Sequence, residues 1–316
     1  MTAPDTTPND LVTTDVTRAA AALRSGGLVA VPTETVYGLA ADATDVTAIA
    51  RIFEVKGRPT GHPLIVHLAD PGDLARWAPQ ASDDAHRLAD TAWPGPLTVI
   101  VPRSDELPPE VAGGRDTVGI RVPAHEMTRA LVRAAGVPIA APSANRFGAV
   151  SPTTAAHVVS DLGGRLDPAS DLVLDGGPCP VGIESTIVDC TTRPPQLLRA
   201  GVVDADQVAA LLGADVAPSS GPSRASGMLA SHYAPRCEIR LVTTRHEADE
   251  LASALDDSRI LHADGDPVVV ARSLYAELRR ADDDGVDVLV AVLPRPHGLG
   301  HAIIDRLTKA AAPRPS

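Results

Sequence analysis

Two pairs of polar side chains, far apart in the sequence, are the residues of this chain best suited to chemistry. Lys56 and Arg58 lie in the stretch Lys-Gly-Arg-Pro, and Ser143 and Asn145 lie in Pro-Ile-Ala-Ala-Pro-Ser-Ala-Asn. Two cations so close repel each other unless an anion or a carboxylate lies between them. Serine and asparagine can both donate and accept hydrogen bonds. Together the four side chains would suit a nucleoside triphosphate.

Each pair also has a structural explanation that involves no ligand. Lys56 and Arg58 follow a predicted helix over residues 45–55, and positive charge is favoured at the C-terminus of a helix. Ser143 and Asn145 are of types that are common in ordinary turns. Neither motif alone indicates a ligand site, and the functional interpretation depends on both motifs occurring in the same chain.

The segments that would position these residues are typical of an α/β protein. Short apolar runs predict strands, and apolar residues at helical spacing predict helices. We expect strands over residues 28–31, 64–68, 97–101, 117–122, 139–141, 172–174, 181–189 and 197–201. We expect helical residues over 15–24, 45–55, 73–92, 126–135, 155–162 and 204–212.

The strand predicted over residues 117–122 has Thr117, Gly119 and Arg121 on one face. An arginine on a strand otherwise built for burial needs a partner, which is either an internal acid or a bound anion. The sequence leaves both possibilities open. His67 also lies in a predicted strand, where a lone histidine is more often structural than catalytic.

The composition changes after residue 213. Residues 214–226 are rich in alanine, proline, serine and glycine, as linkers are, and the pair His232-Tyr233 follows. From residue 237 strands and helices alternate, which predicts a small parallel sheet. We therefore expect one domain over 12–213, a linker that folds over a site over 214–236, and a second domain over 237–312.

Composition and charge exclude several classes of protein. The 316 residues carry a net charge of −12 and only 2% aromatic side chains, which argues against strong nucleic-acid binding. No apolar run is long enough to cross a membrane, and the N-terminus has no secretory pattern. The cysteines form no Cys-x-x-Cys pair, as expected in a reducing compartment, so we predict a cytoplasmic protein.

The motifs indicate transfer chemistry without a protein nucleophile. Ser143 has no Gly-x-Ser-x-Gly frame, and the chain has no Gly-x4-Gly-Lys-Ser/Thr phosphate loop. Positioning and charge stabilisation remain, as in nucleotidyl or phosphoryl transfer.

At this point the ordered motifs resemble the YrdC-like family in its long, two-domain form. The resemblance extends over residues 12–212, the linker and the end of the chain. It rests on these motifs: Thr33-Glu-Thr-Val-Tyr-Gly-Leu39, Lys56-Gly-Arg-Pro59, Pro63-Leu-Ile-Val-His67, Trp93-Pro-Gly-Pro-Leu-Thr98, Ala141-Pro-Ser-Ala-Asn145, Ser151-Pro-Thr-Thr154, Gly182-Ile-Glu-Ser-Thr186, His232-Tyr-Ala-Pro235, Gly298-Leu-Gly-x-Ala302 and Arg306-Leu-x-Lys-Ala310.

The resemblance implies a fold and a reaction. The fold is an open, twisted, mixed α/β sheet with a large concave cavity, followed by a smaller parallel-sheet, Rossmann-like α/β domain. The reaction is a nucleotidyl transfer: L-threonine, bicarbonate and ATP give L-threonylcarbamoyladenylate and pyrophosphate. Apart from the resemblance, we expect Mg²⁺ alongside ATP, because this ion generally accompanies ATP. The product would pass to a tRNA-modifying transferase complex that makes threonylcarbamoyladenosine.

The resemblance also implies roles for individual residues, and no metal ligands among them. The expected catalytic residues are Lys56, Arg58, Ser143 and Asn145. The expected ATP contacts are Arg58, His62, Thr117, Ser143, Ser151, Arg199 and Tyr233, the last as part of a lid. The expected L-threonine contacts are Thr35, His67, Arg121, Ala141 and Ser185.

The chain departs from the family pattern at a few positions. His62 stands where an asparagine is usual, Phe147 replaces a small polar residue, and Leu229 and Ala230 stand where a basic residue is usual. Two other functions remain open. One is an RNA-binding or ribosome-maturation protein of the same fold, and the other is a carbamoyl-transfer module, which normally belongs to a longer chain with zinc-type cysteine motifs.

Overall fold

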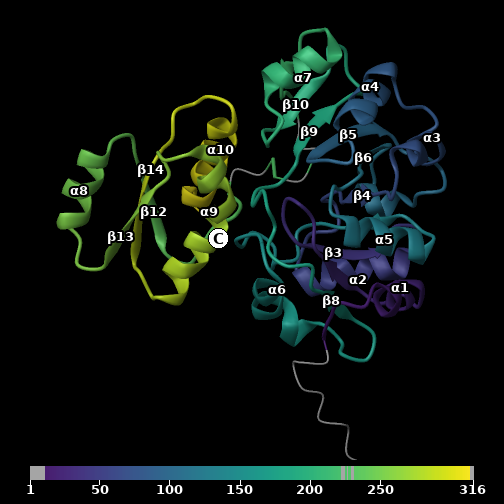
Figure 1. The fold of residues 1–316 in the computed structure, drawn as a ribbon, viewed down its shortest axis with the longest axis horizontal. Helices are drawn as coiled ribbons and strands as arrows, with labels where there is room; N and C mark the ends of the chain where they lie inside the picture. The colour runs from purple at the N-terminus through teal and green to yellow at the C-terminus, as the bar shows by residue number, and fades with distance from the viewer. Residues whose placement is uncertain (1–10, 222–224, 226, 229–230, 314–316) are drawn as a thin grey trace, which may run out of the picture.

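The computed structural model describes residues 11–221, 225, 227–228 and 231–313, and it contains one large and one small sheet (Figure 1). The strands of the large sheet are β1 Val12–Thr13, β2 Val29–Val31, β3 Gly38–Asp42, β4 Ile65–His67, β5 Leu97–Pro102, β6 Thr117–Arg121, β7 Ile139–Ala140, β8 Leu172–Leu174, β9 Thr186–Asp189, β10 Gln196–Arg199 and β11 Ala217–Pro218. Those of the small sheet are β12 Glu238–Val242, β13 Ser258–His262 and β14 Val288–Val292.

Helices surround both sheets. The α-helices are α1 Val16–Arg24, α2 Val46–Lys56, α3 Leu74–Trp77, α4 Asp83–Ala92, α5 Glu126–Ala135, α6 Ala155–Leu162, α7 Ala205–Leu212, α8 Arg245–Ser253, α9 Pro267–Asp283 and α10 Leu299–Ala311. Short 3₁₀ turns are η2 Pro71–Asp73, η3 Pro109–Ala112 and η4 Gly163–Arg165.

The large sheet is mixed, as predicted. Its strand order is β1-β8-β2-β3-β7-β4-β6-β5-β9-β10-β11. Pairs such as β4–β6 and β5–β9 are parallel, whereas β3–β7, β4–β7 and β5–β6 are antiparallel. The short strand β7 lies in the middle of this order, so the polar residues that follow it emerge beside the ends of β3 and β4.

Local sequence explains how helix α2 presents its basic end. Asp45 caps the helix by accepting hydrogen bonds from the amides of Thr47 and Ala48. Gly57 ends it in the left-handed conformation at φ 63°, which glycine adopts without steric cost. Lys56 is therefore the last helical residue, and Arg58 follows the turn.

The strand predicted over residues 181–189 is shorter than expected. Strand β9 begins only at Thr186, and the preceding residues form a loop. Gly182 causes the difference: its φ is 85°, and a Cβ atom there would lie 2.4 Å from the carbonyl oxygen of Ala271 in α9. Close packing against α9 thus bends the chain away from the sheet just before Ser185.

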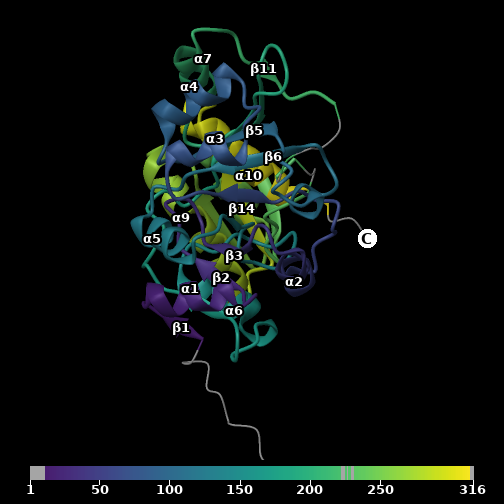
Figure 2. The same ribbon diagram turned by 90° about the vertical axis from the view of Figure 1, so that its right-hand side faces the viewer.

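The C-terminal unit, formed by β12–β14 and α8–α10, contains the predicted parallel sheet in the order β12-β14-β13. Figure 1 shows α9 and α10 on the side facing the large sheet, with α8 on the opposite side. In Figure 2 this unit lies behind the large sheet. An apolar cluster joins the two units, because Val36, Ile183 and Tyr233 pack with residues of α9 and α10.

An ion pair also crosses between the units. Arg279 of α9 lies 2.6 Å from a carboxylate oxygen of Asp161 in α6, and both side chains are largely buried. Within the described residues, no helix is long and apolar enough to span a membrane. The three cysteines are free thiols.

Candidate active site

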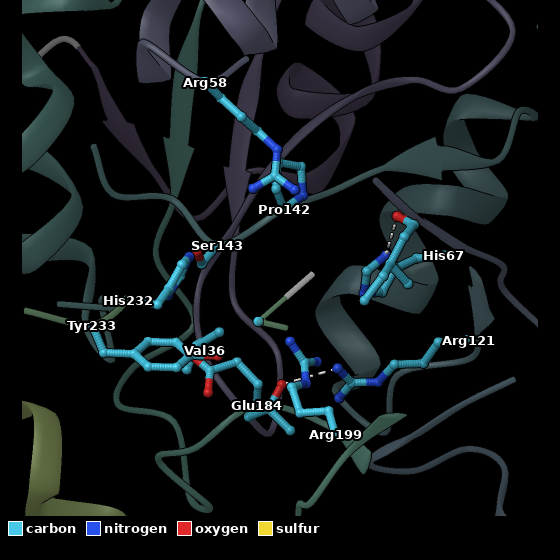
Figure 3. A pocket seen from close by; sticks show the side chains of 13 residues that line it. Val36, Arg58, His67, Arg121, Pro142, Ser143, Glu184, Arg199, His232 and Tyr233 are labelled. Atoms are coloured by element: carbon cyan, nitrogen blue, oxygen red, sulfur yellow. Dashed lines mark hydrogen bonds between the residues drawn. The ribbon is translucent and has the colours of Figure 1, made fainter. Parts of the chain in front are cut away.

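A small hollow lies where the large sheet meets the linker and the C-terminal unit (Figure 3). Its volume is about 50 Å³, much smaller than the large cavity expected from the sequence. The linker residues Gly227, His232 and Tyr233 line one part of the hollow, here called its mouth, and so limit the space left open. The lining residues are Thr35, Val36, Arg58, Ile65, His67, Arg121, Pro142, Ser143, Glu184, Arg199, Gly227, His232 and Tyr233.

Three buried arginines dominate the hollow. Arg58, Arg121 and Arg199 are only 7%, 4% and 6% exposed, and they come from three separate segments of the chain. Figure 3 shows their guanidinium groups directed into the same space from different sides. A concentration of buried positive charge favours an anionic ligand, so this arrangement suits phosphate or carboxylate groups.

The surroundings of Arg58 show how strongly burial acts here. Its Nη2 donates to the carbonyl oxygen of Pro63 at 2.9 Å, and its guanidinium lies 5.6 Å from the ring centre of Phe147. Burial, with a smaller contribution from the positive charge of Arg199, lowers the pKa of Arg58 to about 10 against the opposing effect of Tyr233. Arg58 remains charged at neutral pH and would gain from a bound anion.

Arg121 has the internal acid that the sequence left open. Its Nη2 lies 2.7 Å from a carboxylate oxygen of Glu34, while its Nη1 donates to Thr35 Oγ1 at 3.0 Å. Its Nε donates to the carbonyl oxygen of Gly95 at 3.1 Å. Glu34 was absent from the predicted site residues, although an acid beside Thr35 in a buried stretch is a signal that could have identified it.

Lys56 lies beneath the loop that carries Ser143 and does not line the hollow. Its Nζ donates to the carbonyl oxygen of Ser143 at 2.5 Å and to that of Asn145. Burial, together with Arg58, lowers the pKa of Lys56 well below its usual range. Asn145 is turned to the loop as well, donating from Nδ2 to the carbonyl oxygens of Arg146 and Ala149 at 2.8 and 2.7 Å.

The residues expected to contact L-threonine are only partly brought together. Thr35, His67 and Arg121 line the hollow, but Ser185 and Ala141 do not. Ser185 is fully buried; its hydroxyl is 2.8 Å from Thr98 Oγ1 and accepts from Arg199 Nη2 at 3.0 Å.

His67 is kept neutral. Its Nδ1 is 3.2 Å from the carbonyl oxygen of Ile65. Burial lowers the pKa of His67 to about 3, with a further contribution from Arg121. The imidazole is therefore uncharged at neutral pH.

The expected ATP contacts are divided in the same way. Arg58, Ser143, Arg199 and Tyr233 line the hollow, whereas three others do not: His62, Thr117 and Ser151. His62 is half-buried, with its ring centre 5.3 Å from that of Phe147. Thr117 is the first residue of β6, where it pairs with Pro102, and Ser151 is fully buried.

The hydroxyl of Ser151 donates to Glu184 Oε1 at 2.6 Å. Glu184 itself lines the hollow but was not among the predicted site residues. A glutamate in the middle of a predicted strand, beside Ile183, needs a partner when it is buried, and this was the available signal. Burial raises the pKa of Glu184, but Arg306 and Arg199 outweigh burial and lower the pKa to about 2.

The linker residues at the mouth are held in an unusual conformation. Tyr233 has a positive φ of 64°, which residues other than glycine rarely adopt, and its side chain is buried, with the residue 1% exposed. Among the described residues, neither its hydroxyl nor Nδ1 of His232 has a hydrogen-bond partner. The departures at Leu229 and Ala230 lie outside the described residues.

Comparison with known proteins shows which family this chain belongs to. Residues 21–201 match a sequence family described as "Telomere recombination", and residues 200–312 match one described as "Threonylcarbamoyl-AMP synthase, C-terminal domain". A threonylcarbamoyl-AMP synthase of Pyrococcus abyssi is 39% identical over 322 residues, which cover 94% of each chain. The chain belongs to the threonylcarbamoyl-AMP synthase family.

The family also includes shorter chains. A threonylcarbamoyl-AMP synthase of Thiobacillus denitrificans is 36% identical over 178 residues, which cover 56% of this chain but 91% of the relative. Among solved structures, the crystal structure of P. abyssi Sua5 complexed with L-threonine superimposes with a TM-score of 0.88 at 38% identity, covering 94% of each chain. The two-unit architecture of this threonylcarbamoyl-AMP synthase family member is therefore shared over nearly its whole length.

Proposed function

We propose that this protein condenses L-threonine, bicarbonate and ATP to L-threonylcarbamoyladenylate and pyrophosphate. The observation that carries the proposal is the convergence of Arg58, Arg121 and Arg199 on one hollow, in a chain of this family. Two of the three substrates offer anionic groups by which they can be held, because threonine has a carboxylate and ATP a triphosphate. Three buried guanidinium groups supply complementary charge for both.

Arg121 would bind the threonine carboxylate. A guanidinium group matches a carboxylate in bidentate geometry, and the contacts to Glu34, Thr35 and Gly95 hold this guanidinium in one orientation. Nearby arginine charges lower the pKa of an ammonium group by repulsion, which favours the neutral amine that the reaction needs. The neutral imidazole of His67 adds no further charge.

The chemistry can then proceed in two steps. The threonine nitrogen forms a bond to the carbon of bicarbonate, and water leaves, giving a carbamate. A carbamate oxygen attacks the α-phosphorus of ATP, the bond from that phosphorus to the bridging oxygen breaks, and pyrophosphate departs. Arg58 and Arg199 would stabilise the charge on the phosphates, each contact contributing about 2–4 kcal/mol in the transition state.

Substrate entry requires the mouth to open. A hollow of about 50 Å³ holds a few water molecules, whereas ligand pockets usually measure roughly 300–1,000 Å³. We propose that residues 214–236 act as a lid between a catalytic domain over 12–213 and a C-terminal domain over 237–312. Closing the lid over the product would protect the mixed anhydride from water.

Magnesium would accompany ATP rather than occupy a protein cage. Among the described residues there is no cluster of three or more metal-binding side chains, and the two acids at the hollow already have partners in Arg121 and Arg306. Mg²⁺ commonly retains water and binds phosphate oxygens. We further propose that the protein acts in the cytoplasm and passes its product to a tRNA-modifying transferase complex.

The test is a pyrophosphate-release assay with and without threonine. We expect release to require threonine, bicarbonate and ATP together, and Arg58→Ala and Ser143→Ala each to slow it at least tenfold because transition-state contacts are lost. Arg245→Ala, which removes an exposed arginine of α8, should leave the rate unchanged. Absence of threonine-dependent release from the folded wild-type protein would overturn the proposal, and tight RNA binding in its place would favour the alternative function.

A further inference from the structure

One sequence motif, at Arg306 in the final helix, has no role in the reaction described above. Arg306 lies on the buried stripe of α10 together with Ala302, Ile303, Leu307 and Ala310, and it is 0% exposed. Burying an arginine completely is costly unless its charge is paired. The partners of Arg306 therefore indicate which residues α10 positions.

Arg306 reaches out of the C-terminal unit to two residues of the hollow. Its Nε donates to Glu184 Oε2 at 2.8 Å, and its guanidinium carbon lies 5.3 Å from the ring centre of Tyr233. A second bond, from Nη1 to Asp305 at 2.6 Å, fixes the guanidinium within its own helix. Arg306 thus contacts both the wall and the mouth of the hollow.

Tyr275 of α9 contacts the same two residues. Its hydroxyl donates to Glu184 Oε2 at 2.8 Å, and its ring stacks on that of Tyr233 with centres 5.7 Å apart and planes at 28°. Tyr275 is fully buried. Two helices of the C-terminal unit therefore converge on one carboxylate and one aromatic ring.

Glu184 is consequently held from both units. Oε1 accepts from Ser151 in the large unit, and Oε2 accepts from Tyr275 and Arg306 in the C-terminal unit. The next residue, Ser185, accepts from the guanidinium of Arg199 through both its carbonyl and hydroxyl oxygens, at 2.9 and 3.0 Å. A shift of Glu184 would therefore move the segment that orients Arg199.

We propose that Tyr275 and Arg306 are positioning residues of the active site, supplied by the C-terminal unit and acting through Glu184 and Tyr233. This inference rests on the proposed function. It assigns the C-terminal unit a part in building the site, in place of an independent binding activity. The C-terminal unit fixes Glu184, which lies beside Arg199, and it holds the side chain of Tyr233 in place at the mouth.

The shorter T. denitrificans relative is compatible with a positioning role for the C-terminal unit. A match of 178 residues that covers 91% of the T. denitrificans chain leaves no room for the C-terminal unit in addition to the first. Tyr275 and Arg306 therefore lie in a part of this chain that has no counterpart in the T. denitrificans chain.

The variant Tyr275→Phe isolates the proposed contact, because it removes one hydroxyl and retains the stacked ring. Loss of a buried hydrogen bond to a carboxylate should lower kcat for threonine-dependent pyrophosphate release about tenfold in folded protein. Arg306→Lys keeps the charge but loses the planar guanidinium, so it should lower kcat about tenfold or more. Circular dichroism would confirm that each variant is folded at the assay temperature.

The readout that separates positioning from stability is coupling to Glu184. In a Glu184→Gln background, Tyr275→Phe should produce almost no further loss of kcat, since its effect acts through that carboxylate. The control is Arg279→Lys, a change in the same helix and the same interface whose contacts are with Asp161 and Val150. It should lower the melting temperature while leaving kcat and KM unchanged.

Each outcome has a distinct meaning. An inactive wild-type protein would overturn the proposed function and this inference with it. An active wild type with normal kcat in both folded variants, or equal losses from Tyr275→Phe with and without Glu184→Gln, would overturn the inference alone.

Discussion

At the scale of single residues, the fixed orientation of Arg121 is the main determinant of how threonine would be held. Glu34, Thr35 and the carbonyl of Gly95 each engage a different nitrogen of its guanidinium. Side chains held in this way lose little entropy when a ligand binds. The geometry of the fork, and not only its charge, should therefore matter for threonine affinity.

The variant Arg121→Lys tests this point because it keeps a positive charge but cannot bind a carboxylate in bidentate fashion. We expect the KM for threonine to rise about tenfold or more, with the KM for ATP little changed. Steady-state kinetics with each substrate varied in turn would measure both constants. Arg129→Lys, on the outer helix α5 where the arginine pairs with Asp70 and Glu126, is the matched control.

An equal rise in the KM values for ATP and threonine would contradict the assignment of Arg121 to the carboxylate. Such a result would indicate a general effect on the charge of the hollow. The residue-level division between Arg121 and the pair Arg58 and Arg199 would then have to be abandoned.

At the scale of elements, the linker is the segment whose conformation the hollow depends on. Gly227 has a φ of 83°, and a Cβ atom there would lie 2.7 Å from the hydroxyl of Tyr233 and 3.0 Å from Cδ of Arg199. Only glycine allows the linker to approach these two side chains so closely. Gly227 is thus a point of close contact at which the proposed lid would close against the site.

Gly227→Ala should therefore weaken the closed lid. The substitution adds a left-handed strain of about 1–2 kcal/mol together with a steric clash, so we expect kcat/KM to fall about tenfold or more. Gly213→Ala is the control, because Gly213 also has a positive φ of 64° but has open space around its Cα. It carries the same backbone strain without the clash, and activity should stay near that of the wild type.

A comparable loss of activity in both variants would show that backbone strain, and not closure on Tyr233, causes the effect. Protection of the lid from limited proteolysis by ATP and threonine would be an independent measurement. The protection should be weaker in Gly227→Ala than in Gly213→Ala.

At the scale of the whole molecule, the folded chain buries two neutral histidines. His67 lies in the large sheet, and His232 lies in the linker between the units. Burial lowers the pKa of each to about 3, with Arg121 contributing at His67 and the site cations at His232, where Glu184 acts in the opposite direction. Unfolding would expose both imidazoles to water.

The sign of the pH effect follows from these values. Between the unfolded pKa near 6.5 and the folded pKa of about 3, the unfolded state binds more protons, so stability falls as the pH falls. From pH 7 to pH 5 we expect each histidine to reduce the free energy of unfolding by about 2 kcal/mol. Glu184 adds its own loss only below its unfolded pKa of 4.5, on the way to about 2.

Denaturant unfolding at pH 7 and pH 5 would measure this effect. His232→Gln should show a smaller difference between the two pH values than the wild type, whereas His246→Gln should not, because His246 is 83% exposed. A wild-type stability that does not change over this range would show that the two imidazoles are not buried in the neutral form.

Much of the fold could be predicted from the sequence because its signals are local. The helices predicted over 126–135 and 155–162 have these bounds in the structure, and the Lys-Gly-Arg-Pro motif lies at the end of a helix, whose last residue is Lys56. Capping residues and apolar spacing act within a few positions, so they survive any change in tertiary context. The motif order likewise indicated the family.

The sequence by itself thus determined the mixed α/β class, the parallel second sheet and the basic and polar motifs of the site. Only the tertiary structure decided that Glu34 meets Arg121, that strand β9 starts after Ser185, and that linker residues line the hollow. It also decided that Glu184 is held by Arg306, 122 positions away in the sequence. The reason is physical: a buried charge demands some partner, but which partner it finds depends on how distant segments pack.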